Sequence, residues 1–241
     1  MSIEPVASNP FLVDVVYQRL LAAIIDCTLV PGQRIVQEEI AADLGVSRAP
    51  VSHALQLLKH HGLLQEAGRK GLEVVPIRRE RVRDLYQVRA ALDGIAARLA
   101  AERSANGSLS ETETEALWDT FRGGAALGTD TAMSERVQAD VDFHRALYRA
   151  SGNASIVETL APLWPHLQRA MVMVLGANQV RDRVWREHKH ILDSILTGDP
   201  EGSDRAANRH ATNAGLHTEE YLRTIERVQA PPRRRARQAT P

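Results

Sequence analysis

Four side chains in the second half of the sequence have the chemistry of metal ligands: Asp140, His144, His188 and His210. Asp140 and His144 are four residues apart in a helical pattern, so both point toward the same side of that helix. His188 is in register with the apolar stripe of a later helix, whereas His190 projects elsewhere. His210 lies on an alanine-rich helix that can pack closely. The spacing alone does not show that these helices meet.

One carboxylate and three neutral imidazoles would suit zinc, nickel or a similar divalent ion. The four ligands supply one formal negative charge, so the site would stay net positive and could attract a carboxylate effector. An ion that prefers six ligands would leave positions open for that effector. Tetrahedral coordination would close the site and make it structural.

A second polar pattern lies in GVSRAPVSHALQLLKHHGLL, residues 45–64. Ser47 is placed to cap a helix that begins near Arg48, with its hydroxyl accepting from amides of the first turn. Pro50 is tolerated in that turn, and Gly62 ends the helix. One face of this helix is apolar: Val51, Leu55 and Leu58. Another face carries only polar or charged groups: Arg48, Ser52, Gln56 and Lys59.

The neighbouring segments predict a winged helix-turn-helix over residues 1–76. A first helix is expected over residues 11–26, followed by the turn at Pro31-Gly32. A shorter helix with an apolar side of Val36, Ile40 and Leu44 then precedes the tight turn at Gly45. After the polar-faced helix, LLQEAGRKGLEVVPI indicates two short strands. The tip between them consists of Gly68, Arg69, Lys70 and Gly71.

Residues 12–76 resemble the DNA-binding domain of the GntR family of bacterial transcription regulators, whose SRTPVREAL-like segment corresponds to SRAPVSHAL here. Ser52 and His53 stand where the family usually has Arg and Glu, so an arginine that often contacts the operator is missing. The resemblance implies a DNA-contact set of Ser47, Arg48, Ser52, His53, Gln56, Lys59, Arg69, Lys70 and Gly71.

Positive charge in this region is local. Residues 1–76 contain six Lys or Arg against eight Asp or Glu, but between Ser47 and Gly71 four basic residues face only Glu66. Attraction to phosphates requires a basic face and not a basic domain. The alternative is a solvated helix in an ordinary three-helix unit.

The composition indicates a globular protein. The chain has 241 residues, 44% of them hydrophobic, and 30 basic side chains balance 30 acidic ones, so net charge says nothing about partners. Cys27 is the single cysteine, which excludes an intrachain disulfide, and we expect it in the core. No apolar run approaches a membrane span, and the N-terminus lacks the pattern of a signal peptide. We therefore expect a cytoplasmic protein without a membrane partner.

Beyond Pro76 the pattern is helical throughout. Helices are expected over residues 80–104, 110–127, 132–150, 154–175, 178–197 and 201–228. The fold class is therefore mainly α: a winged helix-turn-helix over residues 1–76, an all-α helical bundle over 77–230, and a basic disordered tail over 231–241. Three tryptophans are expected to fill the core: Trp118, Trp164 and Trp185.

Residues 80–228 resemble the FCD effector-binding domain of the FadR subfamily within the GntR regulators. DVDFHRALYRASGN is similar to its Asp-x-x-Phe-His segment, and EHKHILDSILTGD to its Glu-His-x-x-Ile-Leu segment. The resemblance implies that Asp140, His144, His188 and His210 hold one divalent metal ion inside the bundle. It also implies that Arg89 turns toward the cavity and binds an acidic effector. The alternative for Arg89 is a surface arginine beside Asp93.

These patterns together predict a homodimeric transcription regulator without enzymatic activity. It would bind a pseudopalindromic operator in double-stranded DNA and respond to a small-molecule effector, a carboxylate bound near zinc or nickel. One alternative is a metal-dependent hydrolase fused to a helix-turn-helix. Glu187 could serve as its base, although its place next to His188 is expected to point it away. Another alternative is a regulator that senses the metal ion itself.

Overall fold

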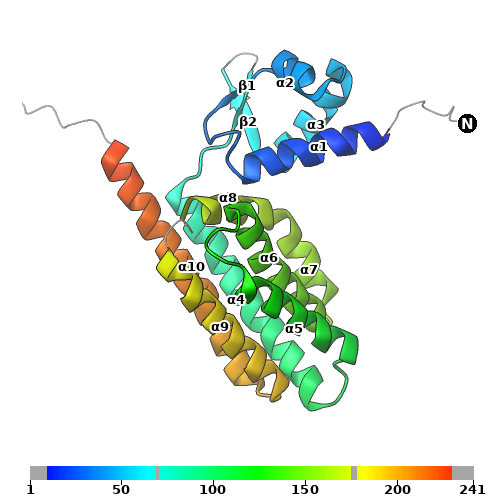
Figure 1. The fold of residues 1–241 in the computed structure, drawn as a ribbon, viewed down its shortest axis with the longest axis vertical. Coiled ribbons are helices and arrows are strands. Elements are labelled where there is room, and N and C mark those ends of the chain that lie inside the picture. Colours follow the sequence, from blue (N-terminus) through cyan, green and yellow to red (C-terminus); the bar gives the residue numbers. More distant parts are fainter. Residues whose placement is uncertain (1–9, 69–70, 175–177, 230–241) are drawn as a thin grey trace, which may run out of the picture.

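The computed structural model describes residues 10–68, 71–174 and 178–229 (Figure 1). The chain is mostly helical, with one small sheet in an N-terminal unit and a helical bundle after it. This confirms the predicted fold class. Within the described ranges no helix is long and apolar enough to cross a membrane.

The helices of the N-terminal unit are α1 (Pro10–Ile25), α2 (Gln37–Leu44) and α3 (Arg48–His60). Gly45 lies between α2 and α3 with φ of 64°, a left-handed conformation that favours glycine. The apolar face predicted for α3 is buried, and Ser47 is its N-cap residue. However, the Ser47 side chain makes no capping hydrogen bond, so that detail of the prediction is wrong.

A three-stranded antiparallel sheet completes the unit. Its strands are β1 (Arg34–Ile35), β2 (Leu64–Ala67) and β3 (Gly71–Val74), in the order β1-β3-β2. The register pairs Leu64 with Val74 and Ala67 with Gly71, which confirms the predicted hairpin. The two-residue β1 was not predicted because it is too short to show a strand pattern. Arg69 and Lys70 lie outside the described residues, as does the tail over 231–241.

Two predictions about the core of this unit are wrong. Val36 precedes α2 and is 41% exposed, so Ala41 takes the buried position on that helix. Cys27 is half-buried, with a left-handed backbone in the turn after α1. The core is formed instead by larger residues of α1, α3 and the sheet, including Ile24, Leu58 and Val74.

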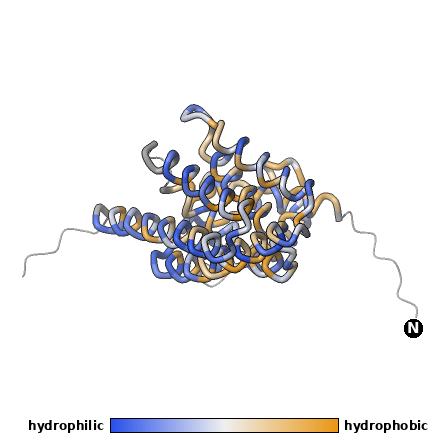
Figure 2. Tube along the Cα trace, turned by 90° about the horizontal axis from the view of Figure 1, so that it is seen from below, coloured by the Kyte–Doolittle hydropathy of each residue, from blue (hydrophilic) through white to orange (hydrophobic). Residues whose placement is uncertain are grey.

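Five long helices form most of the bundle: α4 (Arg79–Ala105), α5 (Glu111–Ala126), α6 (Met133–Ala150), α9 (Asn178–Leu196) and α10 (Pro200–Gln229). Hydrophobic and hydrophilic residues alternate along these helices, as amphipathic helices that bury one side require (Figure 2). Helix α4 contacts α6, α9 and α10. Gly215 allows α10 to approach Tyr86 of α4, because a Cβ at this position would lie 2.7 Å from the Tyr86 Cβ.

The single helix expected over residues 154–175 is wrong. The structure has α7 (Ala154–Leu160), a 3₁₀ turn η1 (Ala161–Leu163) and α8 (Trp164–Val174). Pro162 and Pro165 lack the N–H groups that would continue one α-helix, so the chain changes direction between them. As a result α8 packs against α1 of the N-terminal unit, beside the linker formed by residues 75–78 (Figure 1).

Candidate functional site

The four predicted metal ligands come together inside the bundle. Asp140 and His144 lie on α6, His188 on α9 and His210 on α10, and all four are buried. Each offers one ligand atom, and these atoms lie within 4.8 Å of one another. The helices meet because α6, α9 and α10 all pack against α4.

The distances suit one shared ion. The Nε2 atom of His188 lies 3.2 Å from Nε2 of His144 and 3.1 Å from Nε2 of His210. It also lies 3.4 Å from Oδ1 of Asp140. Two ligands about 2.1 Å from an ion are about 3.0 Å apart at a right angle and about 3.4 Å apart at a tetrahedral angle. The residues present therefore fit a divalent metal ion.

Burial favours the protonation states that metal binding needs. It lowers the pKa of His144 and of His188 well below 6.5, and the charge of Arg89 lowers both pKa values further. Both imidazoles are therefore neutral near pH 7. Burial also raises the pKa of Asp140, and the charges of Arg89 and His210 oppose this rise. A bound cation would favour the ionised carboxylate in the same way.

Two carboxylates outside the ligand set orient the histidines. Nδ1 of His210 lies 2.8 Å from Oε2 of Glu187, and Nδ1 of His144 lies 3.3 Å from Oδ2 of Asp93. If each Nδ1 carries the proton, each Nε2 keeps a lone pair for an ion. The expectation that Glu187 points away is therefore wrong. Sequence reasoning missed the role of Asp93. The one indication in the sequence is that this carboxylate lies in an otherwise alanine-rich part of its helix.

Arg89 is fully buried, so the surface alternative for it is wrong. Its Nε lies 3.3 Å from Oδ2 of Asp93, and its Nη2 donates to Nε2 of His144 at 2.6 Å. Burial disfavours its charge, but Asp93 holds the pKa of Arg89 above its usual range. Because Nη2 uses the lone pair that His144 would give to an ion, the guanidinium and the ion compete for that nitrogen.

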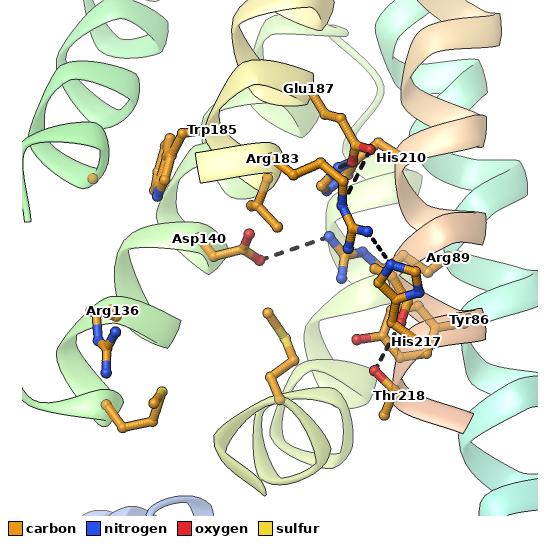
Figure 3. A pocket seen from close by; sticks show the side chains of 15 residues that line it. Tyr86, Arg89, Arg136, Asp140, Arg183, Trp185, Glu187, His210, His217 and Thr218 are labelled. Atoms are coloured by element: carbon orange, nitrogen blue, oxygen red, sulfur yellow. Dashed lines mark hydrogen bonds and ion pairs between the residues drawn. The ribbon is translucent and has the colours of Figure 1, made fainter. Parts of the chain in front are cut away.

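A cavity of about 60 Å³ opens beside the cluster (Figure 3). Three arginines line it, Arg89, Arg136 and Arg183, whereas its carboxylates are those of Asp140 and Glu187. The surplus of positive charge suits a small anionic ligand. Within the described residues, Nη1 of Arg89 is buried without a hydrogen-bond partner and can donate to such a ligand.

The tryptophans have different roles. Trp164 is buried in the core and Trp118 packs against that core, as expected. Trp185 instead lines the cavity (Figure 3). It makes edge contacts with Phe143 and His188. The sequence did not identify Trp185 as a cavity residue. On its helix the predicted ligand His188 is in register with the apolar stripe, so periodicity does not separate cavity positions from core positions.

Five of the predicted DNA-contact residues lie on α3. Arg48, His53 and Gln56 are exposed, and Ser52 and Lys59 are half-buried. Arg48 lies 2.7 Å from Glu38 and Lys59 lies 2.7 Å from Glu66. Exposed pairs of this kind are weak, so both basic groups remain available to another anion. The remaining predicted contacts that the structure describes are Ser47, before α3, and Gly71, at the start of β3.

A side-chain hydrogen bond between α2 and α3 was not predicted from the sequence. The side-chain amide of Gln37 donates to the backbone carbonyl of Arg48 at 2.8 Å. This exposed bond adds to the packing contacts that hold the start of α3 against α2.

Comparison with known proteins assigns both halves of the chain. Residues 12–74 match "Bacterial regulatory proteins, gntR family" and residues 84–213 match the "FCD domain". The HTH-type transcriptional regulator YdhC of Bacillus subtilis is 25% identical over 87% of this chain and 90% of its own length. An HTH-type transcriptional regulator of Streptomyces ambofaciens is 30% identical over 76% of this chain and 75% of its own length.

A solved structure shares the fold. It is a putative GntR transcriptional regulator from Rhodococcus sp. RHA1, with a TM-score of 0.71 at 22% identity. The superposition covers 86% of this chain and 96% of that one. The arrangement of the N-terminal unit and the bundle is therefore found in solved structures as well.

Proposed function

The chain belongs to the GntR family of bacterial regulatory proteins and carries an FCD domain, and from this premise we propose that a small carboxylate bound beside a divalent metal ion controls its affinity for operator DNA. The observation that carries the proposal is the buried cluster of one aspartate and three histidines, with an arginine-lined cavity beside it. Zinc or nickel suits this ligand set best.

A bound ion, which Asp140, His144, His188 and His210 would hold, would supply positive charge beside the cavity. Side chains of the cavity wall would bind and orient the effector. Arg89 donates from Nη1 to the effector carboxylate, while Arg136 and Arg183 add to the positive potential. Tyr86 and Thr218 offer hydroxyl groups on the same wall, which can recognise a hydroxyl or second polar group of the acid (Figure 3).

The geometry favours regulation over hydrolysis. Glu187, the candidate base of a hydrolase, is engaged with Nδ1 of His210 and with the amide of Asn213 at 3.3 Å. A carboxylate held by two donors orients a ligand and is poorly placed to take a proton from water. Buried Arg89 beside the cluster further suits the binding of an anion.

We assign DNA binding to residues 1–76 and effector binding and dimerisation to residues 77–230. Arg48, Ser52, His53, Gln56 and Lys59 would enter the major groove, with Ser47 at the start of the helix. Arg69, Lys70 and Gly71 of the wing would approach the backbone or the minor groove. A homodimer with two such heads would read a pseudopalindromic operator. The effector acts by binding one relative orientation of the heads better than the other.

The test begins with selection of bound sequences from a random DNA pool by the metal-loaded full-length protein. Fluorescence anisotropy then measures the operator Kd with and without members of a panel of small carboxylates. We expect a pseudopalindromic sequence and an acid that changes the Kd about tenfold or more. Arg136→Gln, in the cavity wall, should reduce this response, and Arg122→Gln, on exposed α5, should leave it intact.

Either of two results would refute the proposal. The first is a selected pool without sequence preference, which would show that the protein does not recognise an operator. The second is an effector response that is unchanged in both Arg136→Gln and Asp140→Asn, which would show that the effector does not act through this cavity.

A further inference from the structure

A second cavity, of about 250 Å³, lies where the N-terminal unit meets the bundle; we refer to it as the junction cavity. Its wall combines the end of α3, the linker of residues 75–78, the start of α4 and the middle of α8. Six of its lining residues are arginines or histidines: His60, His61, Arg78, Arg81, His166 and Arg169. No lining residue is acidic, and none is shared with the cavity beside the metal cluster.

Arg169 is the most informative of these residues, because it is only 2% exposed. One nitrogen, Nη2, donates to the backbone carbonyl of Val75, whereas Nε is buried and has no partner among the described residues. Burial lowers the pKa of Arg169, since no carboxylate compensates for the lost hydration. The other fully buried arginine, Arg89, differs in having Asp93 at 3.3 Å and Asp140 at 3.9 Å.

The remaining arginines of the cavity also lack counter-ions. Arg78 directly precedes α4 and Arg81 lies in its first turn, and both side chains are exposed. Among the residues that the structure describes, neither of them forms an ion pair with a carboxylate. A guanidinium buried without a counter-ion is costly, and two more cations at the rim of the same cavity add to its positive potential. Binding of an anion would relieve that cost.

The histidines join the two halves across this cavity. Nε2 of His166, on α8, donates to the backbone carbonyl of His61 at 3.0 Å, passing over Gly62. Nδ1 of His61 is hydrogen-bonded to the Tyr17 hydroxyl at 2.8 Å. Burial lowers the pKa of His166 most, and the charges of Arg169 and Arg81 lower it further against the effect of the hydrogen bond. The field in the cavity is therefore positive.

We propose that the junction cavity binds a compact, multiply charged oxyanion of the phosphate class, either inorganic phosphate or the phosphoryl group of a small metabolite. Three arginines match such an anion in charge, and guanidinium groups bind phosphate oxygens in pairs. Because the lining residues come from both halves, the bound anion holds the N-terminal unit in one orientation relative to the bundle. Operator affinity then depends on this anion as well as on the effector.

The test is calorimetric titration of inorganic phosphate into the full-length metal-loaded protein, without DNA, at constant ionic strength set with chloride. We expect about one phosphate per chain, and at least about tenfold weaker binding in both Arg169→Met and Arg81→Gln. The matched control is Arg205→Gln, on an exposed part of α10, which should bind phosphate like the parent. Equal affinity in all four proteins would overturn the proposal.

Two further measurements keep the outcome decisive. If circular dichroism shows that Arg169→Met is unfolded, the double variant Arg78→Gln with Arg81→Gln, at exposed positions, takes its place. Asp140→Asn should keep phosphate binding, and its loss there would place the anion at the metal cluster instead.

The panel of anions identifies the source. Tighter binding of a small phosphorylated sugar than of inorganic phosphate assigns the site to a metabolite, and the reverse order assigns it to free phosphate. Equal binding of citrate would overturn the phosphate class. Absence of phosphate binding, together with weaker operator binding and a smaller salt dependence in the double variant, would assign the arginines to the DNA backbone and overturn the proposal.

Discussion

At the scale of single residues, the cluster in the bundle is a set of ionisable groups whose charge states depend on one another. Asp93 accepts from Arg89 and, at 2.5 Å, from the Tyr148 hydroxyl. Arg89 in turn donates to His144. His144 is therefore held in place before an ion binds, but an ion must displace Nη2 of Arg89 to reach its Nε2.

Metal binding should persist at mildly acidic pH. Two histidines with an ordinary pKa of 6.5 would lose neutral form between pH 7.5 and pH 6.0 and weaken metal affinity by about tenfold. His144 and His188 have pKa values well below 6.5, so they stay neutral over this range. We expect a loss clearly smaller than tenfold, measured by equilibrium dialysis with elemental analysis. A tenfold loss or more would contradict the burial argument.

The pair formed by Arg89 and Asp93 should be strongly coupled. Arg89→Met leaves the fully buried Asp93 carboxylate without its cation, which should lower the free energy of unfolding by about 3 kcal/mol. Adding Asp93→Asn should recover more than half of this loss, because no uncompensated charge remains. Urea unfolding of the two single variants and the double variant measures the coupling. Additive losses would show that the two residues act independently.

The sequence and the family resemblance singled out the four residues that the structure brings together, but only part of their surroundings. The Asp-x-x-Phe-His spacing of Asp140 and His144 and the register of His188 are local properties of a helix, and the sequence contains them. The role of Glu187 is not local, since it depends on His210 of another helix lying within reach. Arg89 remained ambiguous for the same reason, because its burial depends on how the bundle closes.

At the scale of elements, the position of the cluster depends on how closely α10 approaches α4. Gly215 lies against Tyr86 at this contact, and Asn208 of α10 donates from its side chain to the backbone carbonyl of Ala90 at 3.1 Å. His210 lies on the segment of α10 between these two contacts. A shift of α10 would therefore move one metal ligand relative to the other three.

Gly215→Ala should disturb both stability and metal binding. The added Cβ would lie 2.7 Å from the Tyr86 Cβ and 3.0 Å from its Cγ, so α10 must move. We expect a loss of about 1–3 kcal/mol in the free energy of unfolding, together with weaker metal binding. Gly123→Ala is the matched control, since nothing lies within 4 Å of a Cβ there. Gly123→Ala should leave the free energy of unfolding unchanged or raise it by up to about 1 kcal/mol. Thermal unfolding of both variants and the parent measures these differences.

Equal destabilisation by the two alanine variants would show that the close approach of α10 to Tyr86 is not what sets the bundle geometry. The reverse order, with Gly123→Ala the more damaging, would contradict the packing argument directly.

The elements themselves were largely predictable because their periodicity is strong. The bounds of α4, α5, α6, α9 and α10 agree with the expected helices to within one residue at each end. The break between α7 and α8 was missed because apolar periodicity continues through both prolines. That break is what places α8 against α1, so the junction cavity could not have been foreseen from periodicity alone.

At the scale of the whole molecule, the bundle has several large apolar side chains that are exposed to solvent in the single chain. Val88 and Ile95 are seven residues apart on α4, which places them on one face, and they are 45% and 37% exposed. Leu216 and Tyr221 of the adjacent α10 are 59% and 42% exposed. The face of α4 that carries Val88 and Ile95 suits the proposed homodimer, since exposed apolar side chains that lie together can mark an interaction site.

Charged substitutions on this face should separate the proposed dimer. We expect light scattering to give the mass of two chains for the parent and of one chain for the double variant Val88→Glu with Ile95→Glu, because burying carboxylates in an apolar interface is costly. Val30→Glu, at a position 51% exposed in the N-terminal unit, should leave the mass unchanged. A parent of single-chain mass, or a double variant that stays dimeric, would contradict this assignment.

The most direct test of the proposed regulator is the metal content of the full-length protein purified without an affinity tag or chelator. The cluster predicts about one ion per chain in the parent, retained in His190→Ala, whose side chain is exposed on the same helix, and lost in His188→Ala and His210→Ala. A parent that takes up no metal after incubation with zinc, nickel or manganese would contradict the metal centre, as would full occupancy in His188→Ala.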